Sequence, residues 1–173
     1  MTPLVVVAVV AYGSLAGGSG GEVRVAQGAS GGAFHPVAGG FVPDDSTVEG
    51  CDGDYSCLQQ AFGNVTYREG AKPALAFFEQ QIEVNERVRL DCHRIAHVIG
   101  SAAFARYDGN VAKTFSVGSA TCASGYYHGI LERAFAGVNT KKKLVAVARE
   151  LCVDSGIRRH GFLDYQCQHG LGH

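Results

Sequence analysis

The segment LDCHRIAHVIGSAAFARYDG, residues 90–109, carries the clearest helical pattern in the chain. Its apolar residues recur at intervals of three and four, as at Ile95, Ile99 and Ala102. This spacing predicts an amphipathic α-helix. Asp108-Gly109 is a turn dipeptide, so the helix is expected to end there.

Three further segments are predicted to be helices: about 73–89, 126–135 and 141–154. Pro73 falls in a first turn, where its missing N–H costs nothing. Gly137 follows the second helix as a C′ residue, and Thr140 is a good N-cap for the third, which Gly156 follows. No segment of the domain alternates as a strand would, so we predict an all-α domain of about five to six helices.

The cysteine-containing segments echo one another. Cys92, Cys122 and Cys152 are thirty residues apart, and each precedes a segment with histidine. A further copy runs over 167–173. The period predicts degenerate helix-pair repeats. The last copy ends on His173 with no helix after it, which leads us to expect a C-terminal truncation.

The N-terminal third has a different composition. Residues 3–16 form an almost unbroken apolar run, shorter than the roughly 18 residues needed to span a bilayer. We predict that 1–16 is a signal peptide or an N-terminal membrane anchor, with a buried β-strand as the alternative. Residues 17–50 contain ten glycines and are predicted to be a flexible linker that does not pack. The folded domain is then 51–173.

Six cysteines lie in that domain, at 51, 57, 92, 122, 152 and 167. An even number in an exported chain predicts disulfides and an extracytoplasmic location, with metal-bound cysteine as the alternative. The sequence cannot choose among the pairings, although Cys51 with Cys57 closes the shortest loop and Cys152 with Cys167 the next. C-x-x-C is absent, which excludes the usual zinc-ribbon knuckle, the thioredoxin motif and covalent haem attachment.

Charge excludes another class of function. The chain has 173 residues, enough for one domain with a core, and Lys+Arg 15 against Asp+Glu 16 gives a net charge of -1. Residues 141–143 are the only dense basic run. No basic field is present to neutralise phosphates, so nucleic acid is not an expected partner. A protein or small-molecule partner is not identified, and membrane attachment rests on residues 3–16.

Histidines provide the main chemical signal. Two pairs are four residues apart, His93 with His97 and His169 with His173, while Glu132 follows His128 at the same interval. Side chains four apart on a helix share a face and can hold one ion. The predicted metal ligands are His93, His97, His128 and His169, with His173 and His160 as further candidates. Glu132 is predicted to be a ligand or a general base.

Other residues complete this prediction. Asp91 and Asp164 are expected to orient ring N–H groups, while His35, alone in the linker, is not expected to bind metal. Glycine follows histidine at 128, 160 and 169, which would let a neighbouring helix approach closely. The alternative for each histidine is a local role, such as a hydrogen bond to a carbonyl or a contact with a helix dipole.

The short Cys/His-Gly segments resemble those of lanthionine synthetase cyclase-type proteins. In that family, His-Gly and Cys-His-Gly elements lie at the inner helix ends of an α/α toroid around zinc. Here Gln168 separates Cys167 from His169, the chain has no Trp, and it is too short for a full toroid. The resemblance implies that a His-Gly at a helix start can belong to a metal site.

Together these patterns predict an exported domain that binds a transition metal, zinc or copper, through clustered histidines. One alternative is a disulfide-stapled structural or interaction domain without metal. Others are a metal-dependent hydrolase with Glu132 as general base and a non-covalent haem protein. H-E-x-x-H does not occur, because Arg94 stands where the glutamate would be.

Overall fold

A computed structural model describes residues 41–172, and this part of the chain is helical with no β-strand. The elements are η1 (Glu49–Cys51), α1 (Tyr55–Glu69), α2 (Ala71–Val84), α3 (Glu86–Leu90), α4 (Cys92–Arg106), α5 (Val111–Ser116), α6 (Thr121–Phe135), α7 (Lys141–Leu151), α8 (Ser155–Arg158) and α9 (Gly161–Gly170). Among these, six helices have ten or more residues. The prediction of an all-α domain is confirmed. The predicted signal or anchor segment, most of the predicted linker, His35 and His173 lie outside the described residues.

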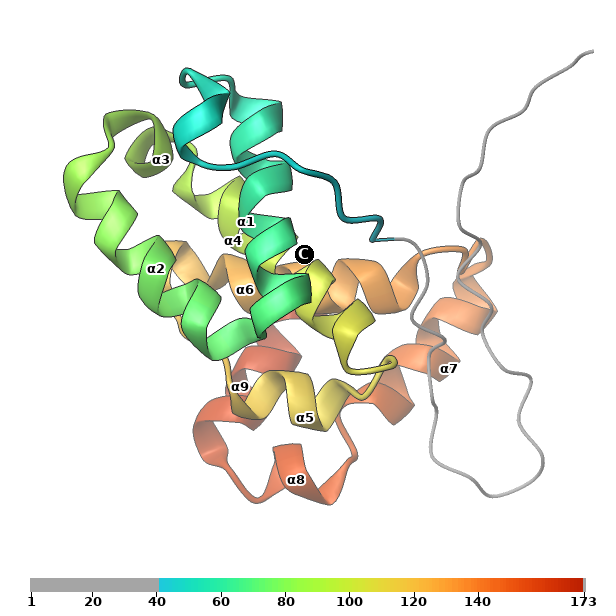
Figure 1. The fold of residues 1–173 in the computed structure, drawn as a ribbon. Helices are drawn as coiled ribbons and strands as arrows, with labels where there is room; N and C mark the ends of the chain where they lie inside the picture. Colours follow the sequence, from blue (N-terminus) through green and yellow to red (C-terminus); the bar gives the residue numbers. More distant parts are fainter. Residues whose placement is uncertain (1–40, 173) are drawn as a thin grey trace, which may run out of the picture.

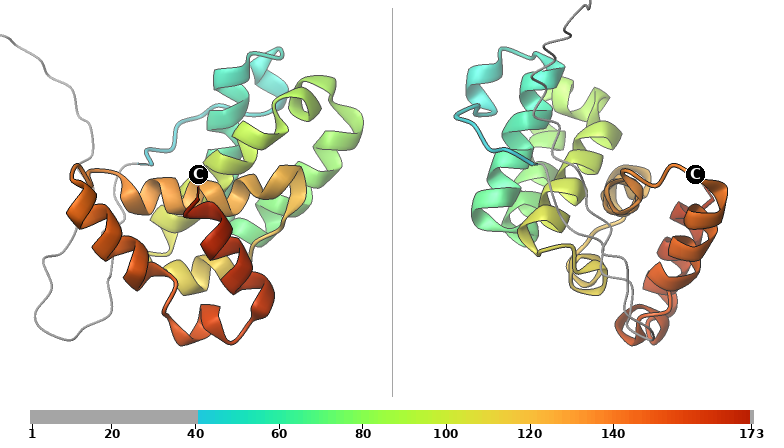
Figure 2. Two further views of the ribbon diagram at one scale, coloured as in Figure 1. Left: turned by 180° about the vertical axis from the view of Figure 1, so that it is seen from behind. Right: turned by 90° about the vertical axis from the view of Figure 1, so that its right-hand side faces the viewer.

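Helices α4 and α6 form the centre of the domain and make its most extensive helix–helix contact. Helices α1 and α2 pack beside α4, while α9 packs against the other side of α6 (Figures 1 and 2). Glycine allows α4 and α6 to meet backbone to backbone. A β-carbon on Gly100 would overlap the carbonyl of Tyr126, and one on Gly129 would overlap the carbonyl of His97.

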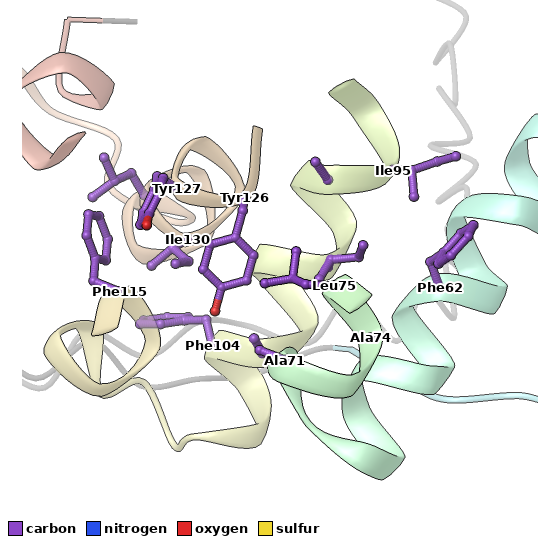
Figure 3. Packing of buried hydrophobic residues seen from close by; sticks show 14 of the residues in the cluster. Phe62, Ala71, Ala74, Leu75, Ile95, Phe104, Phe115, Tyr126, Tyr127 and Ile130 are labelled. Atoms are coloured by element: carbon purple, nitrogen blue, oxygen red, sulfur yellow. The ribbon is translucent and has the colours of Figure 1, made fainter. Parts of the chain in front are cut away.

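The hydrophobic core follows this contact through the domain (Figure 3). The largest fully buried side chains include Phe62 of α1, Phe104 of α4 and Tyr126 and Tyr127 of α6. The Tyr126 hydroxyl donates a hydrogen bond of 2.9 Å to the carbonyl of Thr114. Burial raises the pKa of Tyr127 to about 12. The core therefore packs α6 against both α4 and α5.

Several helix ends agree with the sequence pattern. Pro73 lies in the first turn of α2, Thr140 caps α7 by accepting from the backbone N–H of Lys143, and Gly137 follows α6 with φ 82°. The helix predicted over 73–89 is wrong at one point. Asn85 is extended and accepts from the N–H groups of two following residues, so α2 ends and α3 begins there.

Residues 41–50 lie along α1. The Asn64 side chain donates to the Asp44 carboxylate at 2.8 Å and to the Ser46 carbonyl at 3.0 Å. The ring of Phe41 occupies the space beside Gly63, where a β-carbon would overlap it. The packed domain therefore begins before Cys51, and this part of the predicted linker belongs to it.

All six cysteines are paired, as Cys51–Cys57, Cys92–Cys122 and Cys152–Cys167. The prediction of disulfides is confirmed, and no thiolate is left for a metal. The three cysteines spaced by thirty residues are not equivalent, since the first two pair with each other and the third with Cys167. Three disulfides suggest an oxidising, extracytoplasmic environment. Across residues 41–172, none of the helices has the length and apolar character needed to cross a bilayer.

Candidate metal centre

Helix α4 supplies two histidines from its first two turns. His93 and His97 are one turn apart and their side chains meet, with 3.2 Å between the two Nε2 atoms. His93 is exposed and His97 half-buried. The predicted shared face is therefore present.

The other nitrogen of each ring is already engaged. His93 Nδ1 lies 2.8 Å from the carbonyl oxygen of Cys122, and His97 Nδ1 lies 3.0 Å from Oε2 of Glu132. A carbonyl and an ionised carboxylate only accept hydrogen bonds, so both Nδ1 atoms must donate. In the neutral rings both Nε2 atoms then carry lone pairs, and these point at one another. A cation between them, either a proton or a metal ion, removes that repulsion.

The Cys122 carbonyl is held in place by unusual local backbone. Cys122, Ala123 and Ser124 adopt left-handed conformations, with φ of 54°, 55° and 63°. This conformation costs a residue other than glycine roughly 1–2 kcal/mol. The disulfide from Cys122 to Cys92, the residue before His93, ties this strained turn to the start of α4.

Helix α6 contributes the third histidine. His128 is 8% exposed, and its ring centroid lies 5.5 Å from that of His93 and 5.6 Å from that of His97. One ring nitrogen from each of the three histidines falls within a group whose members are all within 4.8 Å of one another. Three imidazoles with an open fourth position are a sufficient ligand set for a transition metal. The cluster can therefore hold one metal ion.

These rings open into a pocket of about 540 Å³. Its wall includes the apolar side chains of Leu131 and Phe135 and the ring of His169. His169, on α9, lies 5.5 Å from the His128 ring between centroids and stacks on Tyr165. His169 is thus beside the cluster without belonging to its closest group.

A second His-Gly pair lies where α9 meets α6. A β-carbon on Gly170 would overlap the end of the Leu131 side chain, which would have to shift. Gly161, after His160, has nothing within 4 Å of its β-carbon position. The expectation that glycine permits close packing holds at 129 and 170 and fails at 161.

Three of the predicted residues do not line the histidine pocket. His160 is an exposed residue that precedes α9, and it is not among the residues that line the pocket. The Asp91 carboxylate accepts from Gln59 and Arg94, so the expectation that it orients a histidine ring is wrong. Asp164 is half-buried on α9 and is not among the residues that line the histidine pocket.

Glu132 lies at the site in a specific role. Its carboxylate is 73% exposed and accepts from His97, on the side of the ring away from the Nε2 pair. Such carboxylate–histidine pairs fix the tautomer and raise ligand basicity. The Cys122 carbonyl does the same for His93. Sequence reasoning missed that carbonyl, because no residue type marks a backbone acceptor.

The chain was compared with protein-family models, curated proteins and solved structures. No protein-family model, no curated protein and no solved structure matches the chain.

Proposed function

We propose that this domain binds one transition metal ion, zinc or copper, through Nε2 of His93, Nε2 of His97 and a ring nitrogen of His128. The main support is the distance of 3.2 Å between the Nε2 atoms of His93 and His97. Both rings donate a hydrogen bond from Nδ1, which leaves each Nε2 free to bind a metal ion. A tetrahedral ion with bonds of roughly 2.0–2.1 Å places neighbouring nitrogens about 3.3 Å apart. The α4 pair therefore stands near the spacing that a bound ion requires.

The donor set supports the choice of metal. Imidazole suits zinc and copper, whereas magnesium and calcium prefer oxygen ligands. The fourth position faces the pocket, where water, an exogenous ligand or His169 can complete the shell. Haem is less suited to this arrangement, since two of the histidines come from adjacent turns of one helix and converge on a single point.

Binding is favoured over hydrolysis by the position of Glu132. A general base must reach the metal-bound water, while this carboxylate is hydrogen-bonded to Nδ1 of His97. Hydrolysis with Glu132 as base remains a testable alternative. A structural domain without metal is a further testable alternative.

Metal titration of chelator-treated, disulfide-intact protein tests the proposal. We expect one equivalent of zinc or copper(II) to bind by isothermal titration calorimetry and by elemental analysis. Alanine in place of His93, His97 or His128 should each weaken binding by at least about 100-fold, because the coordination shell loses one of three imidazoles. His160→Ala is the matched control and should bind as the wild type does. Equal affinity in all four variants, or no saturable binding, would refute the metal site.

Export is a separate proposal that the apolar residues 3–16 support. We expect the segment to act as a signal peptide or to anchor the protein outside the cytoplasm. N-terminal sequencing of protein from the secreted and membrane fractions distinguishes the two. Full-length protein in the cytoplasm with six free thiols would contradict both.

A further inference from the structure

Arg133 of α6 is a half-buried charged residue that does not belong to the histidine cluster. Its Nε and Nη2 atoms are covered from solvent and have no hydrogen-bond acceptor among residues 41–172. Burial lowers the pKa of this guanidinium, as expected for a charge partly removed from water. Arg133 is half-buried as a residue, and two of its three guanidinium nitrogens contact neither water nor an acceptor. Leaving these donors unpaired is costly, and a bound anion would relieve that cost.

The uncompensated atoms have a definite geometry. Nε and Nη2 form one edge of the guanidinium, with two parallel N–H donors that match the two oxygens of a carboxylate or a phosphate. Neighbouring Glu132 does not fill this role, because its carboxylate accepts from His97. No group among residues 41–172 pairs with this edge, and an oxyanion that displaces the atoms covering it would gain both donors.

Arg133 also lines a pocket of about 250 Å³, separate from the larger one. Ser101, from α4, lines the same pocket. His97 and Glu132 line both pockets, so the two meet at that hydrogen-bonded pair. The volume is below the roughly 300–1,000 Å³ usual for drug-sized ligands, which fits a small anionic group.

We propose that the pocket between α4 and α6 binds a small oxyanion, a carboxylate or phosphate group, through the guanidinium of Arg133, with the Ser101 hydroxyl as a second donor. The Glu132 carboxylate on the same wall opposes an anion, and its hydrogen bond to His97 reduces that repulsion. The site requires no metal and does not depend on the metal proposal. It places an anionic ligand next to the histidine cluster.

The test uses the full chain, oxidised and treated with chelator, so that its result is independent of metal binding. Inorganic phosphate and sodium acetate are titrated separately by calorimetry, with sodium chloride holding the ionic strength constant. We expect saturable one-to-one binding of at least one of the two, and the preferred probe identifies a phosphate or a carboxylate site. No saturable binding of either would overturn the proposal.

Variants assign the effect to Arg133. Arg133→Met keeps the apolar stem and should weaken anion binding at least tenfold. The affinity of Arg133→Lys should lie between those of the wild type and Arg133→Met, because lysine keeps the charge and loses the paired donors. Arg89→Met, at an exposed position on α3, is the matched control and should bind as the wild type does. Unchanged affinity in Arg133→Met would refute the site.

A second measurement covers the case in which Arg133→Met folds poorly. In the wild type, phosphate or acetate should raise the unfolding midpoint relative to chloride at equal ionic strength. In Arg133→Lys, the same anions should raise the unfolding midpoint by a smaller amount. Equal shifts in both proteins would count against the proposal.

Discussion

Gly129 of α6 lies directly against the carbonyl oxygen of His97 of α4, with no room for a β-carbon between them. This contact brings the two helices close enough for His128, the residue before Gly129, to join His93 and His97. The glycine thus connects the packing of the core to the assembly of the histidine cluster.

Gly129→Ala should lower both stability and metal affinity. The added methyl group forces α4 and α6 apart, and overpacking of this kind costs ~1–3 kcal/mol. Urea denaturation and metal titration measure the two effects. Gly161→Ala is the control, since its β-carbon would meet nothing within 4 Å. A Gly129→Ala protein with unchanged stability would show that the two helices can separate without cost.

Glu132→Gln should separate the orienting role of this residue from a catalytic one. The amide can still accept from His97 but has no charge, so metal affinity should fall about tenfold, and Glu132→Ala should lose up to about 100-fold. Glu83→Gln, at an exposed position on α2, should have no effect. Full metal affinity in Glu132→Ala would argue against the orienting role.

The same variant tests hydrolysis. If the wild type turns over an ester or peptide panel, a general base at Glu132 requires Glu132→Gln to keep its metal and lose turnover. Wild-type protein that binds metal and shows no turnover would leave binding as the function.

Opening the Cys92–Cys122 disulfide should weaken metal binding. The bridge holds the turn whose Cys122 carbonyl accepts from His93. Replacing both cysteines by serine should therefore reduce metal affinity, measured by calorimetry. The paired control replaces Cys51 and Cys57, neither of which lines the histidine pocket, and should leave affinity unchanged.

The loss of loop-closure entropy predicts how much each disulfide removal lowers the free energy of unfolding. The closed loops span 30 and 6 residues, for which the loop-entropy relation gives losses of about 3.6 and about 2.2 kcal/mol. Urea denaturation of each variant measures the difference. An equal loss of metal affinity in both would assign the effect to general destabilisation.

Stability should fall at alkaline pH because burial raises the pKa of both Tyr126 and Tyr127. The folded pKa of Tyr127 is about 12, above the value of roughly 10 for an unfolded tyrosine. The un-ionised ring is favoured in the fold, so the contribution of Tyr127 is complete below pH 10 and is lost as pH rises toward 12. The share of Tyr127 in the loss should reach about 2–3 kcal/mol, and Tyr127→Phe should remove that share. Urea denaturation between pH 9 and 12 measures the slope. An identical slope in Tyr127→Phe would contradict the assignment.

The sequence alone determined the features that depend on residues close together in the chain. The three- and four-residue periodicity of 90–109 predicted α4, and Thr140 and Gly137 marked helix ends by their own backbone chemistry. His93 and His97 lie on the same face of the helix because they are four residues, about one helical turn, apart. The even number of cysteines predicted disulfides without their partners. Asn85 shows the limit of periodicity, because a side-chain cap ended a helix that the apolar pattern continued.

Tertiary structure alone decided which distant residues meet. His128 and His169 reach the pocket and His160 does not, although all three precede glycine. The difference is set by helix crossings, which depend on the α4–α6 backbone contact and on the side chains buried around it. The spacing of residues along the chain does not encode those crossings. For the same reason, only the fold reveals the partner of Cys92 and the burial of Arg133.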